Sequence, residues 1–180
     1  MRKLIKSLVC VTLFFLNANS FAYNSSPEIF IQELVDDAIK TLKDKNIPKK
    51  DKLRKIKTIA LANVDINALG MYTLGSVRKT LDKNNFEKYN ELFEKYFLKS
   101  LTSRLIDYSE QKFEVEGSDQ KSETYTMVNS KLVESSSTPE LKIIWRVYTK
   151  DPAKLLIRDL VVEGLSLAKT QKEEFSSVLN

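Results

Sequence analysis

The chain has 180 residues, contains no histidine and has a single cysteine, Cys10. These absences exclude a Ser-His-Asp triad, a Cys-His nucleophile and a zinc site built from imidazole and thiolate ligands. The 29 basic and 24 acidic residues give a formal net charge of +5, which is too small an excess for a dense nucleic-acid-binding face.

The first 22 residues have the three-part layout of an export signal. Residues 2–6 include three positive charges, residues 8–16 form an almost uninterrupted apolar run, and the small-x-small sequence at 20–22 precedes Tyr23. The apolar run is shorter than the roughly 20 residues that a membrane-spanning helix needs. We therefore expect residues 1–22 to be a cleaved signal peptide and 23–180 to be one domain that is released after translocation.

Loss of the signal changes both the cysteine content and the charge. Cys10 lies inside the signal, where we interpret it as an apolar filler rather than a lipid-attachment site. Three of the 29 basic residues leave with the signal, so the mature chain has 26 basic against 24 acidic residues, or +2. The mature chain is thus predicted to be nearly neutral and free of thiols and disulfides.

The first part of the mature chain is predicted to form two helices. Pro27 and Glu28 are typical of a helix start, and apolar residues then recur at helical spacing up to Leu42. A break at 46–48 precedes a second helix, whose segment 49–57 carries six basic side chains on the face away from its apolar line. We interpret those charges as a solvated face, with attraction of anionic head groups or an acidic partner as the alternative.

The next predicted helices differ in length. Residues 65–81 are interrupted by Gly70 and Gly75, which suggests one-turn helices joined by bends. Asp82 is placed to cap a long, amphipathic and aromatic helix that ends near Asp107.

After Ser109 the apolar period changes from helical to alternating. Strands are predicted at 112–116, 124–133, 141–148 and 155–163, with a hairpin loop at 135–139 and a final helix at 166–179. A phase slip at Asp159 indicates a bulge that curves the sheet. The order predicts an α+β fold in which N-terminal helices pack on a curved antiparallel sheet of about four strands with a C-terminal helix.

Two residual catalytic interpretations remain. Paired carboxylates could serve a glycosidase, but the glutamates of the long helix mostly lie opposite its apolar positions. Ser166 and Lys169 have the spacing of serine enzymes with a lysine base, although Ser166 also stands where a helix N-cap belongs. We favour solvated acids and a cap, and predict that the protein is not an enzyme.

Three stretches together resemble the MlaC family, the periplasmic phospholipid-binding components of the Mla pathway, also called toluene-tolerance ABC transporter auxiliary components. The first stretch runs from Leu74-Gly75 through Arg78-Lys79-Thr80, Phe93, Tyr96 and Leu98 to Ser103-Arg104-Leu105 and Tyr108-Ser109. The second, most specific one is the segment 159–167, Asp-Leu-Val-Val-Glu-Gly-Leu-Ser-Leu, and the third is the helix at 169–175. Val77-Arg78 and Leu155 depart from the family, which often has Tyr-Trp and Trp at these places.

The resemblance implies a nuclear-transport-factor-like or cystatin-like fold that encloses an apolar pocket for phospholipid acyl chains. It also implies a carrier that shuttles phospholipid between membrane complexes and maintains outer-membrane lipid asymmetry. The implied partners are an inner-membrane ABC transporter with an MCE-domain protein and an outer-membrane lipoprotein-porin complex. Phospholipid is the expected cargo, and no cofactor or metal is expected.

The bulky apolar residues exceed what one helix must bury against one sheet face, and this surplus supports a pocket. Candidate lipid-binding residues are Leu74, Val77, Phe97, Leu101, Tyr125, Met127, Ile143, Trp145, Val147, Leu160, Val162 and Leu167. About half of these are expected to be ordinary core. The alternative function is a non-catalytic structural or interaction module of the cell envelope whose core is filled and holds no ligand.

Overall fold

The computed structural model describes residues 26–105, 112–134 and 139–179, so the predicted signal peptide lies outside the described residues. The helices are α1 (Pro27–Lys43), α2 (Lys49–Asn63), α3 (Ile66–Leu74), the short 3-10 helix η1 (Val77–Lys79), α4 (Lys83–Leu105) and α5 (Leu167–Leu179). The strands are β1 (Phe113–Ser122), β2 (Tyr125–Leu132), β3 (Leu141–Tyr148), β4 (Leu156–Val162) and β5 (Leu165–Ser166). Within the described part of the chain, no helix is long and apolar enough to cross a membrane.

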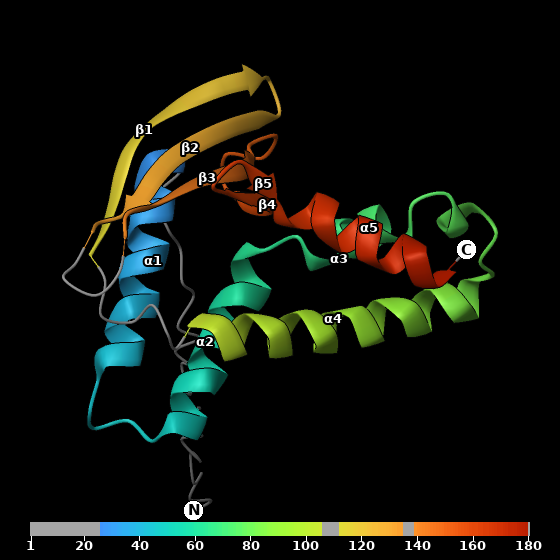
Figure 1. The fold of residues 1–180 in the computed structure, drawn as a ribbon, viewed down its shortest axis with the longest axis horizontal. Helices are drawn as coiled ribbons and strands as arrows, with labels where there is room; N and C mark the ends of the chain where they lie inside the picture. The colour runs from blue at the N-terminus through green and yellow to red at the C-terminus, as the bar shows by residue number, and fades with distance from the viewer. Residues whose placement is uncertain (1–25, 106–111, 135–138, 180) are drawn as a thin grey trace, which may run out of the picture.

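The strands form one antiparallel sheet in the order β1-β2-β3-β4-β5. Figure 1 shows the sheet arching over α1, with α4 and α5 extending to one side. The predicted α+β fold is confirmed, and the sheet has one more strand than expected because the two residues of β5 pair with the end of β4.

The bulge expected from the phase slip lies in β4. Arg146 is opposite Asp159 and Val147 is opposite Ile157, so Arg158 is an extra residue in β4. A bulge of this kind resets the alternation of side chains along the strand. Ile157 and Leu160 therefore face the same side of the sheet although they are three positions apart.

The segment after α2 differs from the expected one-turn helices joined by bends. Gly70 lies inside the continuous helix α3, and a Cβ at this position would come 3.1 Å from Cδ1 of Phe93 in α4. The glycine therefore permits close approach of the two helices rather than a bend. Gly75 does end α3, with a φ of 56° that favours glycine.

The predicted cap of the long helix is confirmed, since Oδ1 of Asp82 accepts a hydrogen bond of 2.9 Å from the backbone N–H of Asn85. This bond is also the main cause that lowers the pKa of Asp82. The structure describes α4 as far as Leu105, and its predicted end near Asp107 lies outside the described residues.

Strand β1 is longer than the predicted segment 112–116. Residues 117–122 are polar and lie beyond the predicted strand, yet their backbone pairs with β2 as far as Ser122. The register shifts between Val115 and Gly117. Pairing with β2, rather than side-chain burial, extends this edge strand.

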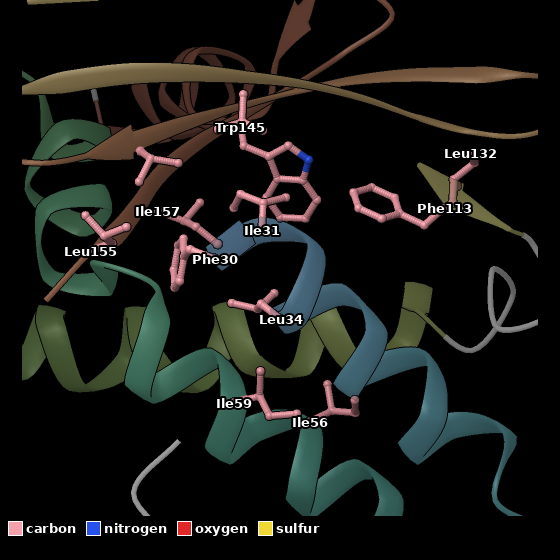
Figure 2. Packing of buried hydrophobic residues seen from close by; sticks show 12 residues of the cluster. Phe30, Ile31, Leu34, Ile56, Ile59, Phe113, Leu132, Trp145, Leu155 and Ile157 are labelled. Carbon is pink, nitrogen blue, oxygen red and sulfur yellow. The ribbon is translucent and has the colours of Figure 1, made fainter. Parts of the chain in front are cut away.

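The main hydrophobic cluster lies between the inner face of the sheet and the helices α1 and α2. Its most deeply buried members include Ile31, Val128 and Val147, each 0% exposed. Figure 2 shows Ile31 and Leu34 of α1 between Trp145 of β3 and the isoleucines of α2. A second cluster joins α2, α3 and α4 through Ala60, Ile66, Phe93 and Leu98.

Candidate functional site

Five of the predicted lipid-binding residues lie on the inner face of the sheet. The register pairs Ile143 with Val162 and Trp145 with Leu160, and Val147 follows on the same face of β3. Trp145 and Val147 are buried in the main cluster, whereas Ile143, Leu160 and Val162 are half-buried. The structure therefore brings these five together, two as packed core and three with part of their surface accessible.

Tyr125 and Met127 do not join that group. They alternate along β2 with the buried Thr126 and Val128, so they face the opposite side of the sheet. There the Tyr125 ring contacts the Tyr148 ring at a centroid distance of 5.7 Å.

The alternation of β2 is difficult to phase from sequence because its inner face carries polar residues. Ser130 is 1% exposed, and its hydroxyl forms two hydrogen bonds with β3. It donates to the carbonyl of Ile143 at 3.0 Å and accepts from the indole N–H of Trp145 at 2.8 Å. Because these bonds satisfy the hydroxyl, a serine is tolerated where an apolar residue would be expected.

The candidate lipid-binding residues in the helices differ in burial and do not form one group. Phe97 and Leu101 of α4 are half-buried and pack against the second cluster. Leu74 is buried at the end of α3, and Val77 is half-buried in η1. Leu167, the first residue of α5, is 44% exposed.

A set of partly buried apolar side chains surrounds the main cluster, and we call it the apolar margin. The apolar margin consists of Val35, Ala38, Ile39, Leu42, Val64, Leu105, Val115, Leu141, Ile143 and Leu160. The sequence-based set contains Ile143 and Leu160 but none of the four α1 residues. The apolar stripe of α1 continues past the buried Leu34 as far as Leu42, and that continuation was the signal for them.

A separate groove of about 190 Å³ lies where the α2–α3 junction, α4 and β4 meet. Its lining includes the charged residues Asp65, Glu94 and Lys154. Pockets for small organic ligands have volumes of roughly 300–1,000 Å³ and are mostly apolar. This groove is therefore too small and too polar to hold acyl chains.

The aspartate of the segment 159–167 is a buried structural anchor. Asp159 is 5% exposed, and its carboxylate accepts hydrogen bonds from the backbone N–H groups of Leu160 (2.8 Å) and Ala168 (2.9 Å). It also accepts from the Ser166 hydroxyl at 2.6 Å and lies 3.3 Å from Nη1 of Arg146. These contacts hold the start of α5 against β4, beside the bulge.

The Glu-Gly pair of the same segment forms the turn between β4 and β5. Glu163 and Gly164 have φ angles of 49° and 81°, which is the combination found at the two central residues of a type I′ hairpin turn. Oε1 of Glu163 accepts a 2.6 Å hydrogen bond from the backbone N–H of Lys142. This bond and the turn fix the edge of the sheet next to α5.

Ser166 caps the N-terminus of α5, and its partner is the backbone of Lys169. The Ser166 hydroxyl donates to Asp159 and accepts from the backbone N–H of Lys169 at 3.0 Å, as an N-cap does. The Lys169 ammonium lies 3.8 Å from Glu173 instead of approaching the serine. The capping interpretation of this pair is confirmed.

An ion pair on the outer face of the sheet links the helices to the bulge. Nε of Arg158 donates to Asp65 at 2.8 Å, and the Arg158 guanidinium carbon lies 3.5 Å from the centroid of the Tyr148 ring. Burial by itself lowers the pKa of Arg158, but its interactions with Tyr125 and Asp65 outweigh burial and raise that pKa. Asp65 also caps α3 through the backbone N–H of Ala68 at 3.1 Å.

The geometry defines an α+β domain whose interior combines a tightly packed cluster with an incompletely buried apolar margin. The family model described as MlaC protein matches residues 32–180, so the chain belongs to the MlaC family. A comparison with curated proteins found no match.

A similar solved structure is that of the phospholipid-binding protein from Ralstonia solanacearum in complex with a phospholipid. It is 17% identical, the alignment covers 87% of each chain, and the TM-score is 0.69. This likeness shows that the two chains share the fold.

Proposed function

We propose that the protein is a periplasmic phospholipid carrier that exchanges lipid between outer- and inner-membrane complexes and thereby maintains outer-membrane lipid asymmetry. The apolar margin is the observation that carries this proposal, because its side chains pack against the core while part of their surface stays accessible. Membership of the MlaC family and the phospholipid held by the Ralstonia protein support the same function.

The energetics of a free phospholipid explain why a carrier is needed. Burial of one methylene group is worth about 0.8 kcal/mol, so exposing two acyl chains of ~16 carbons to water costs on the order of 25 kcal/mol. An apolar site in the protein replaces the bilayer interior and makes loading and unloading nearly balanced exchanges. Such a task needs apolar surface and no catalytic residue.

Among the candidates, we assign the acyl-chain wall to Ile143, Leu160 and Val162 of the sheet and to Phe97 and Leu101 of α4. All five are apolar and half-buried. We add Val35, Ala38, Ile39 and Leu42 of α1 as further wall residues. Trp145 and Val147 are buried and support this wall from behind.

Exchange at two membranes requires partners that give the transfer a direction. We propose an inner-membrane ABC transporter with an MCE-domain protein, whose ATPase supplies the free energy, and an outer-membrane lipoprotein-porin complex. The predicted signal peptide at residues 1–22 supports the location in which these partners could be met.

Native mass spectrometry of the protein purified from the periplasm tests the carrier proposal. We expect a mass excess of one phospholipid over the chain from Tyr23 to Asn180, and its loss after mild organic extraction. A bare mass, together with failure to load from added phospholipid vesicles, would instead support an envelope module that holds no ligand.

A further inference from the structure

The basic residues are strongly concentrated at one end of the helical hairpin formed by α1 and α2. We call residues 40–57 the basic tip; it spans the end of α1, the turn and the first half of α2. It contains nine basic and two acidic residues, a net charge of +7. The remaining residues from Tyr23 onward have 17 basic and 22 acidic side chains, a net charge of −5.

The charges of the basic tip are displayed to solvent. Eight of its nine basic residues are exposed, namely Lys40, Lys43, Lys45, Lys49, Lys50, Arg54, Lys55 and Lys57. The ninth, Lys52, donates from Nζ to the carbonyl of Leu42 at 2.5 Å and so binds the C-terminal end of α1. In the described part of the chain, the one ion pair of the basic tip joins Arg54 to Asp51 at 3.0 Å.

The position of the basic tip makes the distribution of charge uneven along the molecule. Figure 1 shows the turn between α1 and α2 at the end of the molecule remote from the turn between β1 and β2. Strand β1 carries no comparable charge of either sign, because its acidic residues Glu114, Glu116 and Asp119 each form an ion pair with a lysine. Because the basic tip has a net charge of +7 and the rest of the chain from Tyr23 has −5, an anionic surface attracts the basic tip in preference to the rest of the molecule and so orients the protein as it approaches.

The composition of the basic tip fits a lipid surface better than a protein partner. Eight of its nine basic residues are lysines, and it contains no aromatic residue. Protein interfaces are enriched in aromatic residues and arginine and depleted in lysine. Lysine is a flexible point charge that needs no fixed partner geometry, which suits the fluid head groups of a bilayer.

We propose that the basic tip docks the protein on a membrane surface rich in anionic phospholipid. Docking here also brings the apolar margin near the bilayer, because Leu42 belongs to both the apolar margin and the basic tip. The contact is electrostatic, so it weakens as salt shortens the range of the charges. It goes beyond the carrier role, since a chain without cargo would dock equally well.

Co-sedimentation of the purified protein with vesicles tests the proposal. The probes are phosphatidylglycerol-containing vesicles and vesicles of phosphatidylcholine alone, at low and at high salt. The tip variant replaces Lys50, Lys55 and Lys57 by glutamine. The matched control variant replaces Lys88, Lys99 and Lys150 by glutamine. These are also exposed lysines, but they lie outside the basic tip.

We expect binding to the phosphatidylglycerol vesicles at low salt and its loss at high salt. Each lysine near an anionic surface contributes severalfold to the affinity, so the tip variant should bind on the order of tenfold or more weakly. The control variant should bind like the unaltered protein. Replacement of the same three lysines by arginine should preserve binding, and circular dichroism should show that all variants are folded.

Equal binding to both kinds of vesicle, or an equal loss in the tip and control variants, would overturn the proposal. Binding to polyglutamate without binding to the vesicles would overturn it in favour of an acidic protein surface. Lipid carriage is read separately from the mass of the protein recovered from the supernatant. Failure to dock and failure to carry lipid therefore give different results.

Discussion

The two halves of α1 differ in how completely the sheet and α2 cover them. In the first half, Ile31 and Leu34 are 0% and 8% exposed. In the second half, Ile39 and Leu42 continue the same apolar stripe but remain half-buried members of the apolar margin. One helix thus serves two purposes, because its first half packs the fold together and its second half presents apolar surface that the fold covers only in part.

The largest expected effect comes from the same substitution made in each half. Leu34→Ala removes buried methyl groups in a packed site and should lower the free energy of unfolding by about 2–5 kcal/mol. Leu42→Ala should cost less than half as much, since its side chain already contacts solvent. Urea denaturation of the two variants and the unaltered protein measures both values.

Phospholipid loading separates the two halves further. Per folded molecule, Leu34→Ala should retain its phospholipid, whereas Leu42→Ala should retain less. Equal losses of stability, or equal loading, would mean that the division of α1 into a packed half and an open half has no energetic meaning.

The next largest effect tests the contact by which Asp159 anchors the start of α5 to β4. Asp159→Asn keeps the size of the side chain but puts an amide where the carboxylate accepts three hydrogen bonds and faces Arg146. We expect a loss of about 1–3 kcal/mol, because buried donors lose their partner. Thermal unfolding measures it.

Asp119→Asn is the matched control for the aspartate. Asp119 forms an ion pair with Lys121, and both side chains are more than half exposed, so its loss should cost about 0.5 kcal/mol or less. If the two variants unfold at the same temperature, Asp159 does not anchor α5 to β4.

A smaller effect is expected at the contact between α3 and α4. Gly70→Ala places a methyl group 3.1 Å from Phe93. Overpacking typically costs about 1–3 kcal/mol, and the higher helix propensity of alanine offsets about 1 kcal/mol of that cost, so we expect a net loss of up to about 2 kcal/mol. A smaller side chain at position 93 leaves room for the added methyl group. The cost of Gly70→Ala should therefore be smaller in a Phe93→Leu background than in the unaltered protein. Additive losses in a double-mutant cycle would show that the ring does not set the separation of the two helices.

The sequence was sufficient for the features that depend on local patterns. Periodicity located the long helix and three of the strands, and side-chain chemistry located the caps Asp82 and Ser166. The phase slip at Asp159 located the bulge to within one residue of Arg158. Each of these depends on residues that are neighbours in the chain. Local sequence therefore determines them.

Features that depend on distant residues were not found. Gly70 reads as a helix breaker until Phe93 is known to lie against it. The inner face of β2 reads as its outer face until the Ser130 hydroxyl is seen to bond Trp145. The same reason explains why Tyr125 and Met127 entered the candidate site. The apolar stripe of α1 was visible in the sequence, but its incomplete cover in the second half depends on the packing of the sheet and α2.

The smallest effect on stability should have the sharpest effect on function. Ile143 and Ile144 are adjacent in β3 and both half-buried, but Ile143 faces the main cluster and Ile144 faces the opposite side of the sheet. Ile143→Trp adds bulk where we place the acyl chains and should reduce the phospholipid recovered per folded protein, with a change in unfolding free energy of about 1 kcal/mol. Ile144→Trp adds the same bulk on the other side and should carry phospholipid like the unaltered protein. Lipid extraction and native mass spectrometry measure the phospholipid bound by each variant. Equal amounts in the two variants would show that the inner face of the sheet is not part of the lipid site, and would leave α1 and α4 as its remaining walls.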